Sequence, residues 1–422
     1  MLTWPTTLGD DKWISRQELD GLLGQIDEAE SSFVVLLGEP GSGKSALLAR
    51  LGQACCEKGC DVFALKADFL PPLLAEHDRS VEDLGERLRL PADPVTCVRG
   101  LARTNKVVVL LDQLDAVADL VDLRPAPLNM LLDLAQEVAG QTNVHVVMSC
   151  RSFEYGHDIR LQRTGAEERH LALPEWSQVS EVLAERGVEA AGWPDGFCDL
   201  LRRPQHLKVF LQHFSGPQEL QVFSSYQSML DSLWAKEIAP YSERSSLVEE
   251  LAGRMSEEES MWLPAAPFQA RKAAVNHLEA AGVLRREEQG KRLGFAHQTL
   301  FTHARSRAFV SGQASLAEHV LERQHGLFVR PTLWSALVYM RDTHPGAYER
   351  ELGRLWDDRN LRKHIRYLLI DYMGQVSQPA PTEVARFVRC LENGEHVPRI
   401  LQAARAWRVA RVCGRQHGVI WP

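Results

Sequence analysis

The first half of the chain alternates short, continuous apolar runs with segments that carry apolar residues at helical spacing. Apolar runs predict strands at residues 33–37, 106–111 and 144–148, and the mixed segments 60–65 and 169–173 are candidates for a second and a fifth strand. Helical spacing occurs at residues 45–54, 93–103 and 128–139, and Ser80-Val81-Glu82-Asp83 has the form of a capping box that opens another helix. Strands that alternate with helices predict an α/β fold with a doubly wound parallel sheet, in which ligands bind at the carboxyl ends of the strands.

Beyond residue 175 the strand pattern nearly disappears. Helical patterns follow at residues 177–186, 195–203, 205–214, 226–238 and 245–255. The pattern changes again within residues 267–311, where a helix is followed by a short hairpin and a second helix. We expect these parts at residues 268–281 for the first helix, 282–286 and 293–297 for the hairpin, and 298–309 for the second helix. This order predicts a winged helix.

The remaining chain is predicted to be helical throughout. Helices are expected at residues 316–325, 332–342, 346–356, 359–375, 382–392 and 398–412, a spacing that favours stacked helical pairs of the HEAT type. The sequence therefore divides into an α/β domain (1–175), a small helical lid domain (176–266), a winged helix (267–311) and α-helical repeats (312–422). Because Trp421-Pro422 follows no polar capping helix, we expect either that the protein is longer or that another surface covers this end.

One segment has the pattern of a phosphate-binding loop, G-x-x-x-x-G-K-[ST]. It lies between the first apolar run and the first helical segment and consists of Gly38, Glu39, Pro40, Gly41, Ser42, Gly43, Lys44 and Ser45, with Ala46 in the first helical turn. Glycines let the backbone curl so that its N–H groups point at phosphate oxygens, and the helix start adds positive charge. Lys44 is expected to reach the β- and γ-phosphates, and the Ser45 hydroxyl to bind Mg²⁺. The sequence predicts that this loop binds a nucleoside triphosphate.

Two acidic residues and an arginine follow neighbouring predicted strands. Asp112 comes directly after an apolar run, where a carboxylate would hold Mg²⁺ beside the loop as a Walker B aspartate does; the alternative is a turn or helix-capping aspartate. Asp115 is expected to orient or deprotonate an attacking water, or else to be a solvated loop acid or helix cap. Arg151 is expected to sense the γ-phosphate or stabilise transferred charge, or else to form an ordinary ion pair. We therefore name Lys44, Asp112, Asp115 and Arg151 as candidate catalytic residues.

Composition restricts the class of protein further. The net charge of −8 argues against a dedicated surface for nucleic acid or anionic membrane. The chain has no apolar run of about 18 residues and no signal pattern at its start. Its eight cysteines are scattered and suggest buried thiols in a reducing cytosol, so we expect a cytoplasmic protein. No Asn-Lys-x-Asp sequence is present, which favours ATP over GTP.

The order of these motifs resembles that of STAND NTPases, particularly the NACHT-like and bacterial antiviral members, over residues 1–311. The resemblance lies in an arginine-ended strand, a proline in a helical segment and a histidine after the hairpin: Met148-Ser149-Cys150-Arg151, Arg203-Pro204-Gln205-His206-Leu207 and Phe295-Ala296-His297-Gln298. It implies that Pro204 packs near the nucleotide base. It also implies that His297 approaches the β-phosphate of ADP and keeps the resting state closed. The alternatives are that Pro204 merely begins a helix and that His297 is an interface histidine.

The chain departs from that family in two respects. The family usually has a small residue after the Walker B aspartate and paired acids at its end, whereas this chain has Gln113 and Asp115-Ala116, which predicts slow hydrolysis or another subfamily. An effector usually precedes the NTPase, but only about 30 residues do so here. The effector would then be a separate subunit, lie beyond the end of this sequence, or be absent.

The resemblance implies a switch in which ADP holds a closed form. A protein ligand or effector on the helical repeats would favour exchange for ATP, and the ATP-bound chains would form homo-oligomers. One alternative is an AAA+-like ATPase that loads onto nucleic acid through the winged helix, although Glu279, Glu287 and Glu288 oppose contact with DNA. Another is a protein-binding scaffold that depends on nucleotide. No membrane association is expected.

Overall fold

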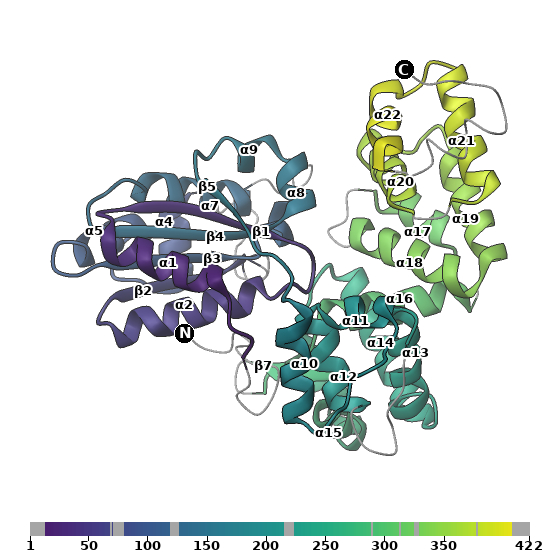
Figure 1. Ribbon diagram of the computed structural model, residues 1–422, viewed down its shortest axis with the longest axis horizontal. Helices are drawn as coiled ribbons and strands as arrows, with labels where there is room; N and C mark the ends of the chain where they lie inside the picture. The colour runs from purple at the N-terminus through teal and green to yellow at the C-terminus, as the bar shows by residue number, and fades with distance from the viewer. Residues whose placement is uncertain are drawn as a thin grey trace. The chain divides into compact units, whose positions relative to one another are not determined.

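The computed structural model describes residues 13–67, 70, 80–118, 126–214, 223–287, 290–311, 314–324, 329–376 and 379–406. The chain forms two compact units, Met1–Gln298 and Thr299–Pro422 (Figure 1). The first unit contains a parallel sheet, a set of helices and a small antiparallel sheet, and the second is helical over its described residues. Within the described residues, no helix has the length and apolar character that crossing a membrane requires.

The larger sheet confirms the predicted five-stranded parallel arrangement. Its strands are β1 (Ser32–Gly38), β2 (Asp61–Lys66), β3 (Val107–Asp112), β4 (Val144–Arg151) and β5 (Glu167–His170). Their order is β2-β3-β4-β1-β5, and every adjacent pair is parallel. Consequently β1, which leads into the phosphate loop, lies inside the sheet, and the carboxyl ends of β1, β4 and β3 are neighbours along one edge.

Helices cover the sheet as its continuous apolar strands predict. In this part of the chain they are α1 (Gln17–Glu28), α2 (Lys44–Glu57), α4 (Val81–Leu88), α5 (Pro94–Leu101), α6 (Asp115–Ala118), α7 (Ala126–Val138), α8 (Ser152–His157) and α9 (Ile159–Gln162). The predicted capping box at Ser80 and Asp83 is present at the start of α4. The cysteines of the described residues are free thiols. The prediction of buried thiols holds for Cys55, Cys150 and Cys390; it is wrong for the exposed Cys56, and the others, Cys60, Cys97 and Cys198, are only half-buried.

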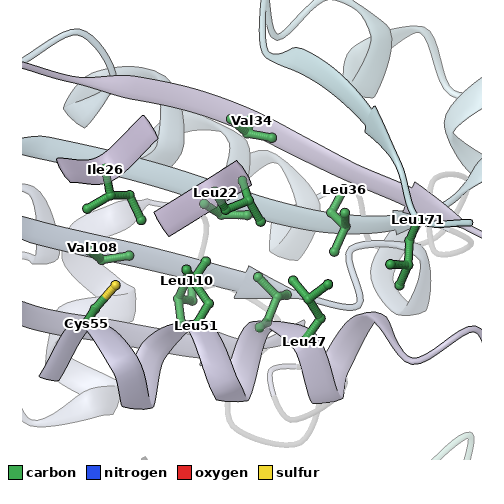
Figure 2. Packing of buried hydrophobic residues seen from close by; sticks show 12 residues of the cluster. Leu22, Ile26, Val34, Leu36, Leu47, Leu51, Cys55, Val108, Leu110 and Leu171 are labelled. Atoms are coloured by element: carbon green, nitrogen blue, oxygen red, sulfur yellow. The ribbon is translucent and has the colours of Figure 1, made fainter. Parts of the chain in front are cut away.

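The core lies against both faces of this sheet. Figure 2 shows the face that is covered by α1 and α2. Strands β1 and β3 contribute Val34, Leu36, Val108 and Leu110 to it, and the two helices contribute Leu22, Ile26, Leu47, Leu51 and Cys55. The neighbouring residues Val35 and Val109 point to the opposite face and are also 0% exposed. On that basis both faces are covered, and the sheet holds the loop between β1 and α2 on a rigid support.

The sequence analysis assigned no helix before the loop, yet α1 lies there. Only Leu22 and Ile26 of this helix are fully buried, and its N-cap residue Arg16 makes no side-chain capping bond. Two core residues four positions apart give a weak periodic pattern, and no capping residue marks the start. Packing on the sheet therefore determines this helix more than local sequence does.

A helical segment follows the sheet within the first unit. Its helices are α10 (Trp176–Glu185), α11 (Asp195–Leu201), α12 (Pro204–His213), α13 (Tyr226–Glu237) and α14 (Ser242–Glu257). Phe197 of α11 and Phe210 of α12 meet edge to face, with ring centroids 5.6 Å apart. The His206 ring stacks on Tyr226 at 3.7 Å, and its Nδ1 lies 3.0 Å from the Leu200 carbonyl oxygen. These contacts fix the start of α12, which approaches the phosphate loop.

The predicted hairpin is present with an additional strand. The elements are β6 (Leu263–Pro264), the 3-10 helix η2 (Ala266–Arg271), α15 (Lys272–Ala280), β7 (Leu284–Glu287), β8 (Arg292–Phe295) and α16 (Gln298–Val310), and the strand order is β6-β8-β7. Part of the expected turn, Glu288 and Gln289, lies outside the described residues. The predicted helix at 268–281 starts as η2 and becomes α-helical only at Lys272. The assignment as a winged helix remains a prediction.

The second unit consists of helices in its described residues. After α16 they are α17 (Leu316–Glu322), α18 (Val329–Thr343), α19 (Pro345–Asp357), α20 (Lys363–Gln375), α21 (Pro381–Glu392) and α22 (Val397–Ala406). α18 packs on α19 and α20, and α22 packs on α20 and α21. The fully buried Glu383 accepts hydrogen bonds from Arg341 and Tyr348. Residues 407–412 of the last predicted helix lie outside the described part, and the HEAT-type assignment remains a prediction.

Candidate functional site

The phosphate-binding motif forms a tight loop between β1 and α2. Gly41 (φ 76°) and Gly43 (φ 100°) adopt left-handed backbone conformations, which glycine enters without strain. A Cβ atom on Gly38 would lie 2.9 Å from Ser42 Oγ and 3.3 Å from the Leu171 carbonyl oxygen. Each of these three glycines is therefore required by the local geometry.

Backbone donors are concentrated where the loop enters α2. Ser42 N–H closes a turn by donating to the Glu39 carbonyl oxygen at 3.2 Å. The helix begins at Lys44 after the N-cap residue Gly43. Because the first N–H groups of a helix have no acceptor within it, those of Lys44, Ser45 and Ala46 belong to the end that attracts anions. The loop thus has the geometry that its sequence predicts.

Lys44 is folded against this loop. The residue is 9% exposed, and its Nζ donates to the carbonyl oxygens of Gly38 at 2.8 Å and Glu39 at 3.0 Å. Burial lowers the pKa of Lys44, the negative charges of Asp115 and Asp112 oppose this shift, and the positive charge of Arg151 adds to it. The charges of the three other candidate catalytic residues therefore act on Lys44.

Asp112 ends β3 and is 0% exposed. Ser149, on the adjacent strand β4, donates its hydroxyl hydrogen to Asp112 Oδ1 at 2.6 Å. The same Ser149 Oγ accepts the backbone N–H of Gln113 at 2.9 Å. Ser149 therefore fixes both the carboxylate and the turn after it. The sequence analysis did not name Ser149 as a site residue, although a hydroxyl near the end of an otherwise apolar strand is a usable signal.

Gln113, directly after this aspartate, has φ 60°. A residue with a side chain rarely adopts the left-handed region, where strain costs roughly 1–2 kcal/mol. The departure noted in the sequence, a large residue in place of a small one, thus falls at a position whose backbone favours glycine. The bonds from Gln113 N–H and Leu114 N–H to Ser149 hold this conformation.

Arg151 ends β4 and contacts three other residues through its three guanidinium nitrogens. Nε lies 2.9 Å from Asp115 Oδ2, and Nη2 donates to Gln298 Oε1 at 2.7 Å. Nη1 lies 3.8 Å from Glu154 Oε1. Asp115 is the first residue of α6, and its other oxygen, Oδ1, is buried without a hydrogen-bond partner in the described chain. Arg151 thus forms the ion pair that the sequence analysis gave as the alternative to a catalytic role. Its catalytic role remains a prediction.

The start of α12 lies against the phosphate loop. Gln205 N–H donates to the Gly41 carbonyl oxygen at 3.4 Å, and a Cβ atom on Gly41 would lie 2.8 Å from Gln205 Oε1. A Cβ atom on Gly43 would lie 3.7 Å from Pro204 Cγ. Pro204 does begin a helix, as one alternative held, and it also lies beside the loop. The sequence analysis did not give Gln205 a role.

A second unpredicted contact comes from Arg16, just before α1. Its side chain is buried and donates to the carbonyl oxygens of Ser42 and Ala172, both at 2.9 Å. Burial lowers the pKa of this guanidinium. No feature of the sequence near Arg16 distinguishes it from a surface arginine, so only the folded chain reveals that it supports the loop.

His297 lies in the link between β8 and α16. Burial, together with the positive charges of Lys208, Arg285 and Lys66, lowers its pKa to about 3. The imidazole is therefore neutral near pH 7. Its electrostatic neighbours come from α12, β7 and the end of β2, while the next residue, Gln298, contacts Arg151.

The donor set at the loop suits a hard cation. Asp112 and Ser45 offer oxygen atoms, which Mg²⁺ prefers. The described residues contain no group of three or more His, Cys, Asp or Glu side chains placed to hold a metal ion. A cation held here would complete its coordination with phosphate and water, as Mg²⁺ does with nucleotides.

A phosphate loop between β1 and α2, at the carboxyl edge of a five-stranded parallel sheet with an aspartate ending β3, defines an α/β P-loop NTPase core followed by a helical region. No protein-family model and no curated protein matches the sequence.

Solved structures similar to this chain include three with bound nucleotide or ATPase in their descriptions. The ORC2 protein of Aeropyrum pernix, in ADPNP and ADP complexes, is 12% identical, with 71% of this chain and 97% of that chain covered and a TM-score of 0.38. A Walker-type ATPase of Pyrococcus abyssi is 15% identical (72% and 99% covered, TM-score 0.39). AMPPCP-bound DnaA of Aquifex aeolicus is 14% identical (82% and 95% covered, TM-score 0.32). Because these TM-scores lie below 0.5, the class of fold rests on the sheet and loop.

Proposed function

We propose that the chain is a STAND-type switch that binds and slowly hydrolyses ATP, with an ADP-bound resting state and an ATP-bound active state. The observation that carries this proposal is the tight, glycine-dependent loop whose Lys44 is influenced by the charges of Asp112, Asp115 and Arg151. Grouped lysine and arginine side chains beside orphan helix N–H donors suit a polyphosphate. The adjoining carboxylates suit its divalent cation.

Each residue has a distinct part in the proposed hydrolysis. Ser45 and Asp112 would hold Mg²⁺, which would neutralise phosphate charge, and Ser149 keeps the Asp112 carboxylate oriented. Lys44 leaves the loop carbonyls and binds phosphate oxygens. Asp115 Oδ1 is buried and has no hydrogen-bond partner among the described residues, so it is suited to accept a hydrogen bond from an attacking water. Slow turnover follows if Arg151 must first exchange its protein contacts for the γ-phosphate.

The contacts of α12 support the proposed resting state. Gln205 bonds to the loop and Pro204 lies beside it, so a bound nucleotide would touch the sheet domain and the helical segment together. His297 in its neutral form accepts or donates a hydrogen bond without adding charge. In this proposal a protein trigger or effector binds the helices of the second unit, and defence against phage is one setting for such a switch.

A nucleic-acid loader of the AAA+ type is the alternative. The hairpin that would contact DNA carries Arg285 and Arg286, which pair with Glu287 at 3.2 Å and Glu279 at 2.5 Å. Paired arginines contribute little to phosphate attraction, so the switch is favoured. Strong, salt-sensitive DNA binding by the purified protein would reverse this order of preference.

Calorimetry with ATP, ADP and GTP in the presence of Mg²⁺ tests nucleotide binding. We expect ATP and ADP to bind, and Lys44→Ala to weaken the binding of ATP by at least about tenfold, because a charged donor to phosphate is lost. Lys58→Ala is the matched control, since that lysine follows the same helix and pairs with Asp27 at the surface. Unchanged ATP affinity in Lys44→Ala would contradict the proposal.

Mass determination tests the switch itself. We expect the purified chain to have the mass of a monomer with ADP and a larger mass with a non-hydrolysable ATP analogue. Lys44→Ala should keep the smaller mass under both conditions. If the wild type had the same mass with both nucleotides, the proposed ATP-dependent assembly would be wrong, while nucleotide binding would be unaffected.

A further inference from the structure

The Arg151 side chain lies between the candidate catalytic site and the segment that follows the hairpin. Its strand position pairs with Gly38, the last residue of β1, so the two backbones are about 4.8 Å apart and the arginine starts beside the phosphate loop. Nη2 donates to Gln298 Oε1 at 2.7 Å, while Nε faces Asp115 at 2.9 Å. Arg151 thereby connects the candidate site with Gln298, which lies 147 positions further along the sequence.

The candidate site holds two cations, Arg151 and Lys44, beside the carboxylates of Asp115 and Asp112. Arg151 is near enough to Lys44 for its positive charge to act on the amine. The Arg151 side chain is 22% exposed and that of Asp115 only 6%, so these charges are poorly screened by water. An oxygen with full negative charge would be attracted by both Arg151 and Lys44.

The acceptor on Gln298 is neutral, whereas a phosphate oxygen is charged. Hydrogen bonds with an ionised acceptor as well as an ionised donor are stronger than those with a neutral acceptor. A γ-phosphate at the loop would compete with Gln298 for Nη2, and ADP has no γ-phosphate with which to compete. We propose that Gln298 sets the preference between nucleoside di- and triphosphate by holding Arg151 away from the γ-phosphate.

This inference rests on the proposed nucleotide binding and adds a specificity-determining residue to it. Gln298 is the last residue of the first unit, and the chain continues directly into the second. Release of Gln298 from Arg151 would therefore accompany the binding of a triphosphate. Gln298 acts through Arg151 and is a positioning residue.

The test compares affinities for ADP and for a non-hydrolysable ATP analogue by calorimetry with Mg²⁺. Gln298→Met keeps the side-chain length and removes the acceptor, so we expect roughly threefold to tenfold tighter binding of the analogue with ADP affinity unchanged. Gln298→Glu offers a charged acceptor and should weaken the analogue by a similar factor, again without changing ADP binding. The control is Gln53→Met on exposed surface of α2.

The double variant isolates the pathway of the effect. In an Arg151→Met background, Gln298→Met and Gln298→Glu should no longer change the preference between the two nucleotides. Equal changes for ADP and the analogue, no change for either, or an effect that persists without Arg151 would each overturn the inference while nucleotide binding stands. Loss of all nucleotide binding in the wild type would overturn the proposed function as well.

Discussion

The residues around the candidate site differ in how far local sequence predicts their place. The loop glycines and Lys44 follow from a contiguous pattern, and Asp112 and Arg151 from their positions at strand ends. Ser149 and Asp112 are 37 positions apart, so their bond depends on β3 and β4 being neighbours, which no local pattern specifies. The contacts of Arg16 and Gln205 with the loop likewise follow only from the folded chain.

Gln113 gives a residue-scale prediction. Because φ is 60° at this position, Gln113→Val should lower the free energy of unfolding by roughly 1–2 kcal/mol, since a β-branched side chain is strained there. Gln113→Gly relieves strain but increases the freedom of the unfolded chain, so its free energy of unfolding should stay within about 1 kcal/mol of the wild type. Chemical denaturation of both variants and the wild type measures these free energies of unfolding. If Gln113→Val were as stable as the wild type, the backbone of the turn would have relaxed and the prediction of strain would be wrong.

At the scale of elements, the sequence predicted the strands best. Largely apolar runs identified β1, β3 and β4, because burial of these strands on both faces leaves few polar positions. β5 is instead polar and mostly exposed, and the predicted strand at 169–173 overlaps it only at Arg169 and His170. α1 was missed since only two of its residues enter the core. β6 was also missed, because a strand of two residues has no readable alternation and exists through its pairing of Leu263 with Leu293. The strand order itself depends on packing between distant segments.

At the scale of the whole molecule, buried histidines link stability to pH. Burial is the main cause that lowers the pKa of His206 to about 3 and that of His145 to about 4. At His206 the bond to Leu200 opposes this shift of the pKa and the charge of Arg203 adds to it. In the unfolded chain both would take up protons below about pH 6.5. Folded stability should therefore be full above that pH and fall as the pH decreases, by roughly 1.4 kcal/mol per pH unit for each such histidine.

Chemical denaturation between pH 7.5 and pH 5 checks this expectation. His206→Phe retains a ring against Tyr226 and should reduce the slope of stability with pH by about one proton, although its absolute stability falls with the loss of the bond to Leu200. His344→Phe is the control, because that histidine is exposed. The same slope in His206→Phe and the wild type would exclude His206 as the origin of the pH dependence.

The single guanidinium of Arg16 has a practical consequence for any attempt to isolate the sheet domain. Arg16, just before α1, donates to the carbonyl oxygen of Ser42 in the phosphate loop and to that of Ala172 just after β5. One side chain therefore connects these two backbone segments. A shortened protein that starts at Gln17 would keep every residue of the phosphate-binding motif but lose the hydrogen bonds of Arg16. Fragments intended for binding studies should therefore begin no later than Trp13 and extend beyond Ala172.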